Sequence, residues 1–405
     1  MRLHQLPSSK TQTRRKTPKF TPIFIALTLL LLTIPLHFPF FRISSRKLSQ
    51  NNNNHPDNKC DLFSGEWVPN PNGPYYTNKT CDAIQEHQNC MKFGRPDTGF
   101  LRWRWKPDDC ELPVFDPHKF LRLVEGKSLA FVGDSVSRNH MQSLICLLSM
   151  VAHPIDLSDP TDQNKRYIYK QHNFSISIFW APYLVKTGKL DPDNEGRPFD
   201  LYLDEPHQHW PAKIKLFDYV IISAGHWFFR PSYFHLNNRL IGCLYCPDPN
   251  VTQLTPAFSY RLAFKTAFQA INAAAGSTSV VFMRTFAPSH FEGGEWDSGG
   301  DCARTTPFKR NDTVLEDRFL EMYLIQLEEL GIAQKAGRGT GGRFRLFDTT
   351  KAMMLRPDGH PSKYGHWPGA NRVMYNDCVH WCLPGPIDSW GDFLQELVRR
   401  EIGGD

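Results

Sequence analysis

The stretch SLAFVGDSVSRNHMQSLICLLSM, residues 128–150, decides the fold. It begins with a short apolar run, Ser128–Val132, passes through Gly133-Asp134-Ser135 and then shows a helical pattern over Ser137–Met150. A buried strand, a tight loop and a helix in this order form the repeating unit of parallel α/β sheets. We therefore expect Ser135 at the carboxyl end of a strand and at the mouth of a helix.

Further apolar runs recur along the chain, with helical patterns between several of them. Alternating strands and helices predict a mostly parallel sheet with helices on both faces and reactive groups at the carboxyl ends of its strands. Lys335–Arg343 is expected to be a surface loop, because it lacks the pattern of a phosphate-cradling loop. The other predicted strands are 175–180, 217–223, 278–284 and 344–347, and the other predicted helices are 258–275 and 313–330.

The composition excludes several classes of protein. With 405 residues, 40% hydrophobic and 22% charged, the chain is neither a disordered tail nor a multi-span membrane protein. Its net charge of +6 comes from the six Lys and Arg of residues 1–19, a segment without acids. Since the rest of the chain is balanced in charge, no nucleic-acid partner is expected.

An uncharged run at 20–41 follows this basic tail. It is about as long as the roughly 20 apolar residues that span a bilayer, and it lacks a clear small-x-small cleavage site at its end. These features favour a signal anchor over a cleaved signal peptide, and the basic cluster before the run places the tail 1–19 in the cytosol. The polar segment 42–59 is expected to be a flexible stem, with the rest of the chain in the lumen.

An oxidising lumen should show paired cysteines and glycosylation sequons, and both occur. All ten cysteines follow the stem. Cys243-Leu-Tyr-Cys246 has the spacing of two zinc ligands, but no second pair completes a site, so a local disulfide or two separate bridges is favoured and no metal is expected. The sequons lie at Asn78, Asn173, Asn250 and Asn311.

Residues 60–118 are rich in Trp, Pro, Asn and Cys and show little periodicity. We expect a loop-rich lobe stapled by disulfides and packed on a catalytic domain over 119–405. Its aromatic side chains could stack on sugar rings or fill the core, and the sequence leaves both interpretations open. They are Trp67, Tyr75, Tyr76, Trp103 and Trp105.

Ser135 is a candidate nucleophile. The free N–H groups at the start of a helix point at whatever bonds to this oxygen, so they would stabilise an oxyanion on an attached acyl group. The alternative is that Ser135 or Ser137 only caps the helix.

A serine nucleophile needs a base, and the base needs a group that orients it. The segment Asp377-Cys378-Val379-His380 could supply both, because residues three apart can share one side of a helical turn. The alternative is a surface pair in a disulfide-held loop. The other histidines considered are His360, the competing base; His226, which with Gly225 could line the site; and His290, interpreted as a loop histidine.

Longer motifs surround these residues. With them the chain resembles the plant trichome-birefringence-like family of polysaccharide O-acetyltransferases, whose catalytic domain is similar to GDSL/SGNH hydrolases, over about residues 60–400. The motifs are GDSVSRN at 133–139, Gly225-His226-Trp227, SHFEGGEWDSGGDC at 289–302, Asp358-Gly-His-Pro361 and DCVHWCLPG at 377–385.

The resemblance implies an SGNH-like three-layer α/β/α domain in a single-pass type II Golgi membrane protein. It implies transfer of acetyl groups to hemicellulose hydroxyls by a triad of Ser135, Asp377 and His380. No bound cofactor is implied; the acetyl donor, acetyl-CoA or another carrier, is a co-substrate, and a donor-supplying membrane protein is an expected partner. Related hydrolases carry Asn at the position of His226, so a rearranged oxyanion site is expected. Its candidate residues, with those for substrate binding, are Gly133, Asp134, Arg138, Asn139, Gly225 and His226.

The resemblance also implies a disulfide pattern for eight of the ten cysteines, to which Cys243 and Cys246 are additional. The implied pairs are Cys60–Cys110, Cys81–Cys146, Cys90–Cys382 and Cys302–Cys378.

The expected reaction passes through an acetyl-serine. Xyloglucan is the favoured acceptor, because the stretch Gly65–Asn78 looks nearer to the xyloglucan-acting members than to the xylan-acting ones; xylan and mannan are the alternatives. Two rival functions are an acetylesterase that uses the same triad and a non-catalytic carbohydrate-binding wall protein.

Overall fold

The computed structural model describes residues 60–188, 198–274, 278–338, 342–367 and 375–403. The expected cytosolic tail, anchor and stem lie outside these ranges. Within them, no helix combines the length and the apolar character needed to cross a bilayer.

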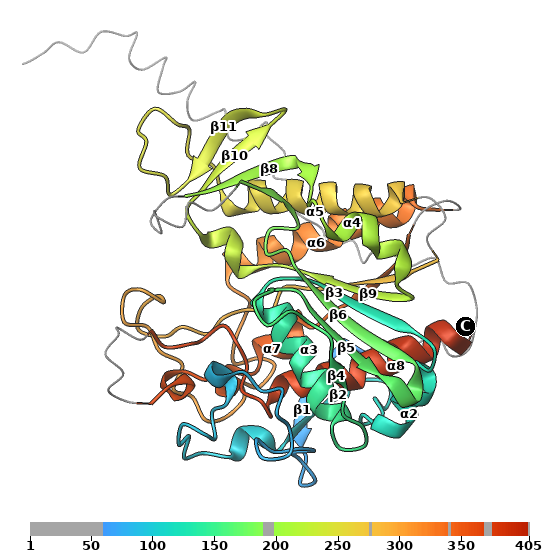
Figure 1. Cartoon of the computed structure of the whole chain (residues 1–405). Coiled ribbons are helices and arrows are strands. Elements are labelled where there is room, and N and C mark those ends of the chain that lie inside the picture. The colour runs from blue at the N-terminus through green and yellow to red at the C-terminus, as the bar shows by residue number, and fades with distance from the viewer. Residues whose placement is uncertain (1–59, 189–197, 275–277, 339–341, 368–374, 404–405) are drawn as a thin grey trace, which may run out of the picture. The chain divides into compact units, whose positions relative to one another are not determined.

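A seven-stranded sheet forms the centre of the molecule, in the order β13-β12-β9-β3-β6-β5-β4 (Figure 1). The pairings from β13 to β6 are parallel, and β5 and β4 add an antiparallel edge. The strands are β3 Ser128–Gly133, β4 Ile155–Asp156, β5 Lys165–Tyr169, β6 Phe174–Trp180, β9 Tyr219–Ser223, β12 Val280–Arg284 and β13 Arg343–Phe347.

Alternate residues of these strands bury two separate cores. On β3, Ala130 and Val132 face one core and Leu129 and Phe131 face the other. Figure 1 shows α5 and α6 on one side of the sheet and α3 and α8 on the other, which gives a three-layer α/β/α arrangement. The helices are α2 Pro117–Leu123, α3 Ser135–Leu148, α4 Trp210–Lys213, α5 Pro256–Ala273, α6 Asp317–Ala336, α7 Thr350–Met354 and α8 Ser389–Gly403.

The parallel strands lie within two residues of their predicted bounds. The helix predicted at 313–330 is found further along, at Asp317–Ala336. A second sheet in the order β11-β10-β8-β7 was not predicted at all. Its strands are β7 Val185–Thr187, β8 Phe199–Pro206, β10 Ser232–Leu236 and β11 Arg239–Leu244.

The region 60–118 contains one antiparallel pair, β1 Gly65–Pro69 with β2 Trp103–Pro107, and is otherwise short turns and loops. Three of its aromatic residues are core: Trp67 donates to the carbonyl of Ala352, Trp105 to that of Leu62, and Tyr76 to Asp388. Tyr75 and Trp103 stay half-buried and line a small surface hollow beside Trp67. The structure thus separates aromatic residues that fill the core from two that remain accessible.

Candidate active site

Ser135 is the first residue of α3 and follows directly on β3. Asp134 is the N-cap of this helix: its Oδ1 accepts hydrogen bonds from the backbone N–H groups of Val136, at 3.0 Å, and Ser137, at 3.3 Å. The capping role considered for a serine is therefore filled by the aspartate. The half-buried Ser135 hydroxyl forms no hydrogen bond to another described residue, so it is available for chemistry.

Gly133 is required where β3 ends. Its φ of 155° is unfavourable for other residues, and a Cβ would overlap the backbone oxygen of Ser223 on β9. This close approach places the turn before Ser135 between the neighbouring strands. Gly133 therefore shapes the site through the backbone, and its expected role in binding stays a prediction.

Asp134 also ties the nucleophile loop to the loop after β9. Its Oδ2 accepts the N–H of Gly225 at 3.0 Å, so this predicted oxyanion donor is engaged within the protein. Burial raises the pKa of Asp134, and nearby Arg284 opposes that shift. Burial in turn lowers the pKa of Arg284 to about 10, which leaves it a cation. Asp134 and Gly225 thus hold each other in place, and their expected substrate contacts stay a prediction.

Asp377 and His380 form the arrangement expected of a catalytic pair. Asp377 Oδ2 lies 2.8 Å from His380 Nδ1, while Oδ1 accepts the backbone N–H of Val379, at 3.1 Å, and of His380, at 2.9 Å. The other ring nitrogen, Nε2, is buried and has no hydrogen-bond partner among the described residues. A buried nitrogen without a partner is costly unless a substrate or nucleophile occupies it.

The electrostatics of this pair suit a general base. Burial works against the charge of Asp377, yet His380 and its hydrogen bonds lower the pKa of the carboxyl group far below its usual range. Burial alone would lower the pKa of His380, but Asp377 raises it above its ordinary value. A carboxylate that stays ionised and holds the ring by Nδ1 stabilises the imidazolium formed during proton transfer.

Asn139 brings the two halves of the site together. It lies one helical turn after Ser135, on the same face of α3. Its Oδ1 accepts the N–H of Trp381 at 2.8 Å and its Nδ2 donates to the carbonyl of Trp381 at 3.3 Å. The face of α3 that carries Ser135 therefore packs against the segment that carries His380. This contact engages the Asn139 amide in positioning Trp381, and its place in the oxyanion site stays a prediction.

Arg138 and His226 also have partners within the protein. Arg138 lies over the ring of Trp180, 4.6 Å from its centroid, and donates to Gln163 Oε1 at 2.8 Å. His226 Nε2 lies 2.9 Å from the carbonyl oxygen of Ala287, and burial lowers its pKa to about 4. Neither contact tests the predicted binding role.

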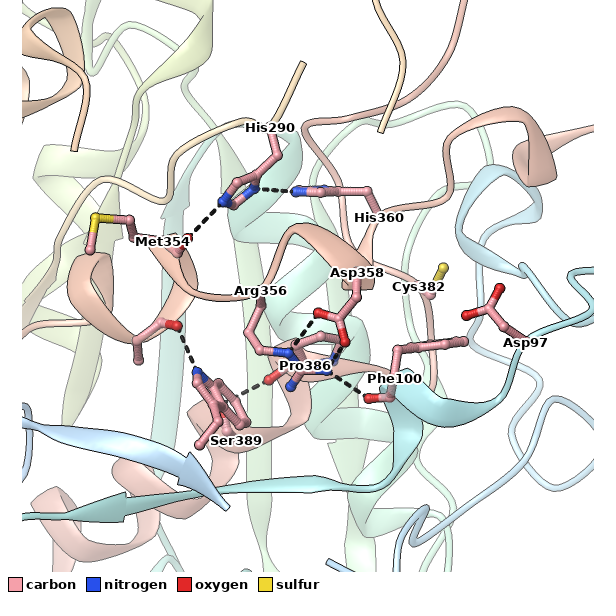
Figure 2. Close-up of polar contacts among 12 residues, drawn as sticks. Asp97, Phe100, His290, Met354, Arg356, Asp358, His360, Cys382, Pro386 and Ser389 are labelled. Atoms are coloured by element: carbon pink, nitrogen blue, oxygen red, sulfur yellow. Dashed lines mark hydrogen bonds and ion pairs between the residues drawn. The ribbon is translucent and has the colours of Figure 1, made fainter. Parts of the chain in front are cut away.

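His360, the competing base, has a different position. Its Nδ1 lies 2.7 Å from the backbone oxygen of His380 and its Nε2 lies 2.7 Å from Nδ1 of His290. Both nitrogens are occupied, so His360 supports the segment of His380 and is not free to accept a proton from Ser135. His290 belongs to the same cluster (Figure 2), which corrects its interpretation as a plain loop histidine.

His87 was missed by sequence reasoning. It comes from a short 3-10 helix, Glu86–Gln88, and its ring lies edge-on to that of His380 with 5.1 Å between centroids. Burial lowers the pKa of His87 to about 4, so the ring is neutral at neutral pH. A single histidine in a region of loops carries no motif by which it could have been recognised.

Disulfides attach the N-terminal region to the triad segment. The four pairs implied by the resemblance are those found in the structure, and Cys243 pairs locally with Cys246, which removes the thiolates a zinc ion would need. Cys90–Cys382 and Cys302–Cys378 flank His380. The other two are Cys60–Cys110 and Cys81–Cys146.

The predicted sequons differ in accessibility. Asn173, Asn250 and Asn311 are exposed. Asn78 is half-buried, and its Nδ2 donates to Oδ1 of Asn89 at 3.2 Å, a bond that attachment of a glycan at this nitrogen would alter.

Two family descriptions together match nearly all of the described chain. "PC-Esterase", the GDSL/SGNH-like acyl-esterase family found in Pmr5 and Cas1p, matches residues 112–397. The PMR5 N-terminal domain matches residues 58–111.

Several curated plant proteins are similar over most of their length. "Protein trichome birefringence-like 19" of Arabidopsis thaliana is 53% identical over 94% of this chain and 93% of its own. "Xyloglucan O-acetyltransferase 2" of the same plant is 43% identical over 85% and 84%. "Xyloglucan O-acetyltransferase 4" of Populus trichocarpa is 42% identical over 93% and 89%.

Proposed function

The chain belongs to the GDSL/SGNH-like acyl-esterase family found in Pmr5 and Cas1p, and from this premise we propose that it transfers acetyl groups to hydroxyls of a plant cell-wall hemicellulose. Xyloglucan is the proposed acceptor, because relatives that cover most of this chain carry that polymer in their names. We further propose that the chain is a single-pass Golgi membrane protein whose catalytic domain lies in the lumen.

One observation carries the proposed mechanism. The ring of His380 is held at Nδ1 by Asp377, and its unpartnered Nε2 belongs to the segment that Asn139 fastens to the helix of Ser135. These contacts support His380 as the general base towards the Ser135 hydroxyl.

In the first step, His380 Nε2 takes the proton of the Ser135 hydroxyl as its Oγ attacks the acetyl carbonyl of the donor. The tetrahedral intermediate collapses, the acetyl-serine ester forms, and the leaving group of the donor takes the proton from His380. With acetyl-CoA as donor, the leaving group is the thiol of coenzyme A.

In the second step, a sugar hydroxyl gives its proton to His380 Nε2 and attacks the acetyl-serine. Collapse transfers the acetyl group to the sugar oxygen and returns the proton to Ser135. Transfer outruns hydrolysis when the acceptor is held in near-attack geometry, where effective molarities of about 10⁵ M or more exceed the roughly 55 M of water. The half-buried Tyr75 and Trp103 are the proposed sugar-facing side chains of the N-terminal region.

The test is incubation of the full chain with acetyl-CoA, with and without xyloglucan, xylan or mannan oligosaccharides, followed by mass spectrometry of the products. We expect acetylated xyloglucan oligosaccharides and a Ser135-acetylated protein in the absence of acceptor. The family description includes esterases, so acetylesterase is the second candidate; it predicts acetate release from acetylated oligosaccharides and no acetylated product.

A further inference from the structure

Buried His360 and half-buried His290 form a series of three polar contacts that ends on the backbone of His380. His290 Nε2 lies 3.0 Å from the carbonyl oxygen of Met354, and His290 Nδ1 lies 2.7 Å from His360 Nε2. His360 Nδ1 lies 2.7 Å from the carbonyl oxygen of His380. Figure 2 shows His290 between Met354 and His360.

A count of hydrogens shows what these three polar contacts require. Carbonyl oxygens only accept hydrogen bonds, so both outer nitrogens, His290 Nε2 and His360 Nδ1, must carry a hydrogen. The inner contact, between His290 Nδ1 and His360 Nε2, needs one hydrogen more. Three are needed, but two neutral imidazoles carry one each. With only two, unshared electron pairs would face each other at 2.7 Å.

We propose that His290 and His360 share one proton beyond the two of their neutral rings, and that this imidazole–imidazolium pair positions His380 by holding its backbone carbonyl. The role as a positioning pair rests on the proposed function of the triad. The short inner contact agrees with it, because charge-assisted hydrogen bonds are shorter than neutral ones.

Burial opposes a charge on either ring, and the pair limits this cost by holding one charge between two rings. Burial lowers the pKa of His290 to about 4, against its bond to Met354. Burial, with His290 next to it, lowers the pKa of His360 well below its ordinary value, against its bond to His380. One shared proton is stabilised by all three contacts at once, which neither ring alone could be.

Charged side chains from several segments of the chain act on the pair. Asp358 and Glu292 favour the proton on His290 and Arg304 opposes it, while Asp377 favours a proton on His360 and Arg95 opposes it. Asp358 is itself paired with buried Arg356, beside the histidines (Figure 2).

The pair is matched to a single protonation state. Loss of the extra proton leaves the inner contact without a hydrogen, and a second extra proton would set two N–H groups against each other there. Either change releases one of the three bonds. The ring of His360 also stacks on Trp381, with centroids 4.1 Å apart, so its displacement is transmitted to the residue next to His380.

Nitrogen NMR of the full-length protein labelled with ¹⁵N-histidine tests the proton count without any assay of transfer. The four ring nitrogens of the pair should include one unprotonated nitrogen throughout the pH range of activity, identified by comparison with the His290→Gln and His360→Phe variants. Two unprotonated nitrogens would overturn the proposal.

The pH dependence of kcat tests the positioning role. The side-chain amide introduced by His290→Gln can donate to both Met354 and His360, so this variant needs no extra proton. We expect the wild type to lose kcat at alkaline pH as the pair deprotonates, and His290→Gln to keep it. The same alkaline loss in both proteins would overturn the role. His235→Gln, in β10 of the second sheet, is the control and should match the wild type.

His360→Phe keeps a ring against Trp381 but removes the donor to His380. Since a small misplacement of a catalytic group can cost about 10²-fold, we expect a loss of that order in kcat with KM unchanged. If the wild-type protein transfers no acetyl group to any acceptor, the proposed function fails, while the nitrogen count still decides whether the pair holds its proton.

Discussion

The two halves of the candidate site are built in different ways. Ser135 is positioned by regular structure, between the end of a central parallel strand and the first turn of a helix whose cap is Asp134. His380 lies in a segment with almost no regular structure, held by Asn139, His360 and two flanking disulfides. Local sequence suffices for the first half, whereas the second depends on contacts from distant parts of the chain.

Ser135→Ala should have the largest effect and tests whether the regular half carries the chemistry. We expect transfer to fall by about 10⁴-fold or more, because the loss of a nucleophile removes the covalent route. Stability should change by about 0.5 kcal/mol or less, since the hydroxyl has no partner among the described residues. The measurements are kcat with oligosaccharide acceptors and thermal unfolding. Ser175→Ala is the matched control, because Ser175 is also half-buried and its hydroxyl has no hydrogen-bond partner among the described residues. Unchanged transfer in Ser135→Ala would contradict the proposed triad.

Asp377→Asn tests the irregular half, with an expected loss of about 10⁴-fold in kcat. His380 must be unprotonated to act as a base, so wild-type activity should rise with pH through a pKa that Asp377 raises above the ordinary value. The variant removes the carboxylate that raises the pKa of His380 but keeps the burial that lowers it. Its residual activity should therefore extend to lower pH, as a pH–rate profile would reveal. Asp312→Asn, at an exposed site, should leave the pH–rate profile unchanged. If the acid limb of Asp377→Asn moved to higher pH, the assigned role of Asp377 would be contradicted.

Removal of the Cys90–Cys382 bridge tests whether distant contacts hold the second half. The double Ser variant should lose about 2–5 kcal/mol of unfolding free energy, because the bridge closes a loop of 292 residues. The Cys243–Cys246 bridge closes three residues, and its double Ser variant should lose about 2 kcal/mol or less. Denaturant unfolding compares them, and equal losses would refute the distinction.

His87→Phe should have the smallest effect. The ring keeps its edge contact with His380, and the neutral histidine contributes no charge at neutral pH, so we expect less than about a tenfold change in kcat. A loss as large as that of Asp377→Asn would mean that His87 takes part in proton transfer. His153→Phe, at an exposed site, controls for the substitution itself.

The same contrast explains what sequence could predict. Apolar runs and turn residues are local, so β3, the GDS turn and α3 were predicted to within two residues. The DxxH segment was also recognised. Its surroundings were not, because His87 and the His290–His360 pair reach His380 only through tertiary folding. The sequence likewise offered donors at Gly225 and Asn139 but could not show that Asp134 and Trp381 engage them.

The second sheet was missed for a related reason. In β10 and β11 the register shifts between Phe234 and His235, and such a bulge breaks the alternation by which strands are recognised. β8 also pairs with β10, although β9, a strand of the central sheet, lies between them in the sequence. Neither feature leaves a periodic signal.

The bridge between Cys90 and Cys382 also bears on the timing of biosynthesis. A nascent chain emerges from its N-terminal end, so Cys90 is synthesised 292 residues ahead of its partner Cys382. The bridge that holds the segment of His380 can therefore form only after translation has passed residue 382. The two ends of the folded region are thus joined late, by a bond that the local sequence around either cysteine does not provide.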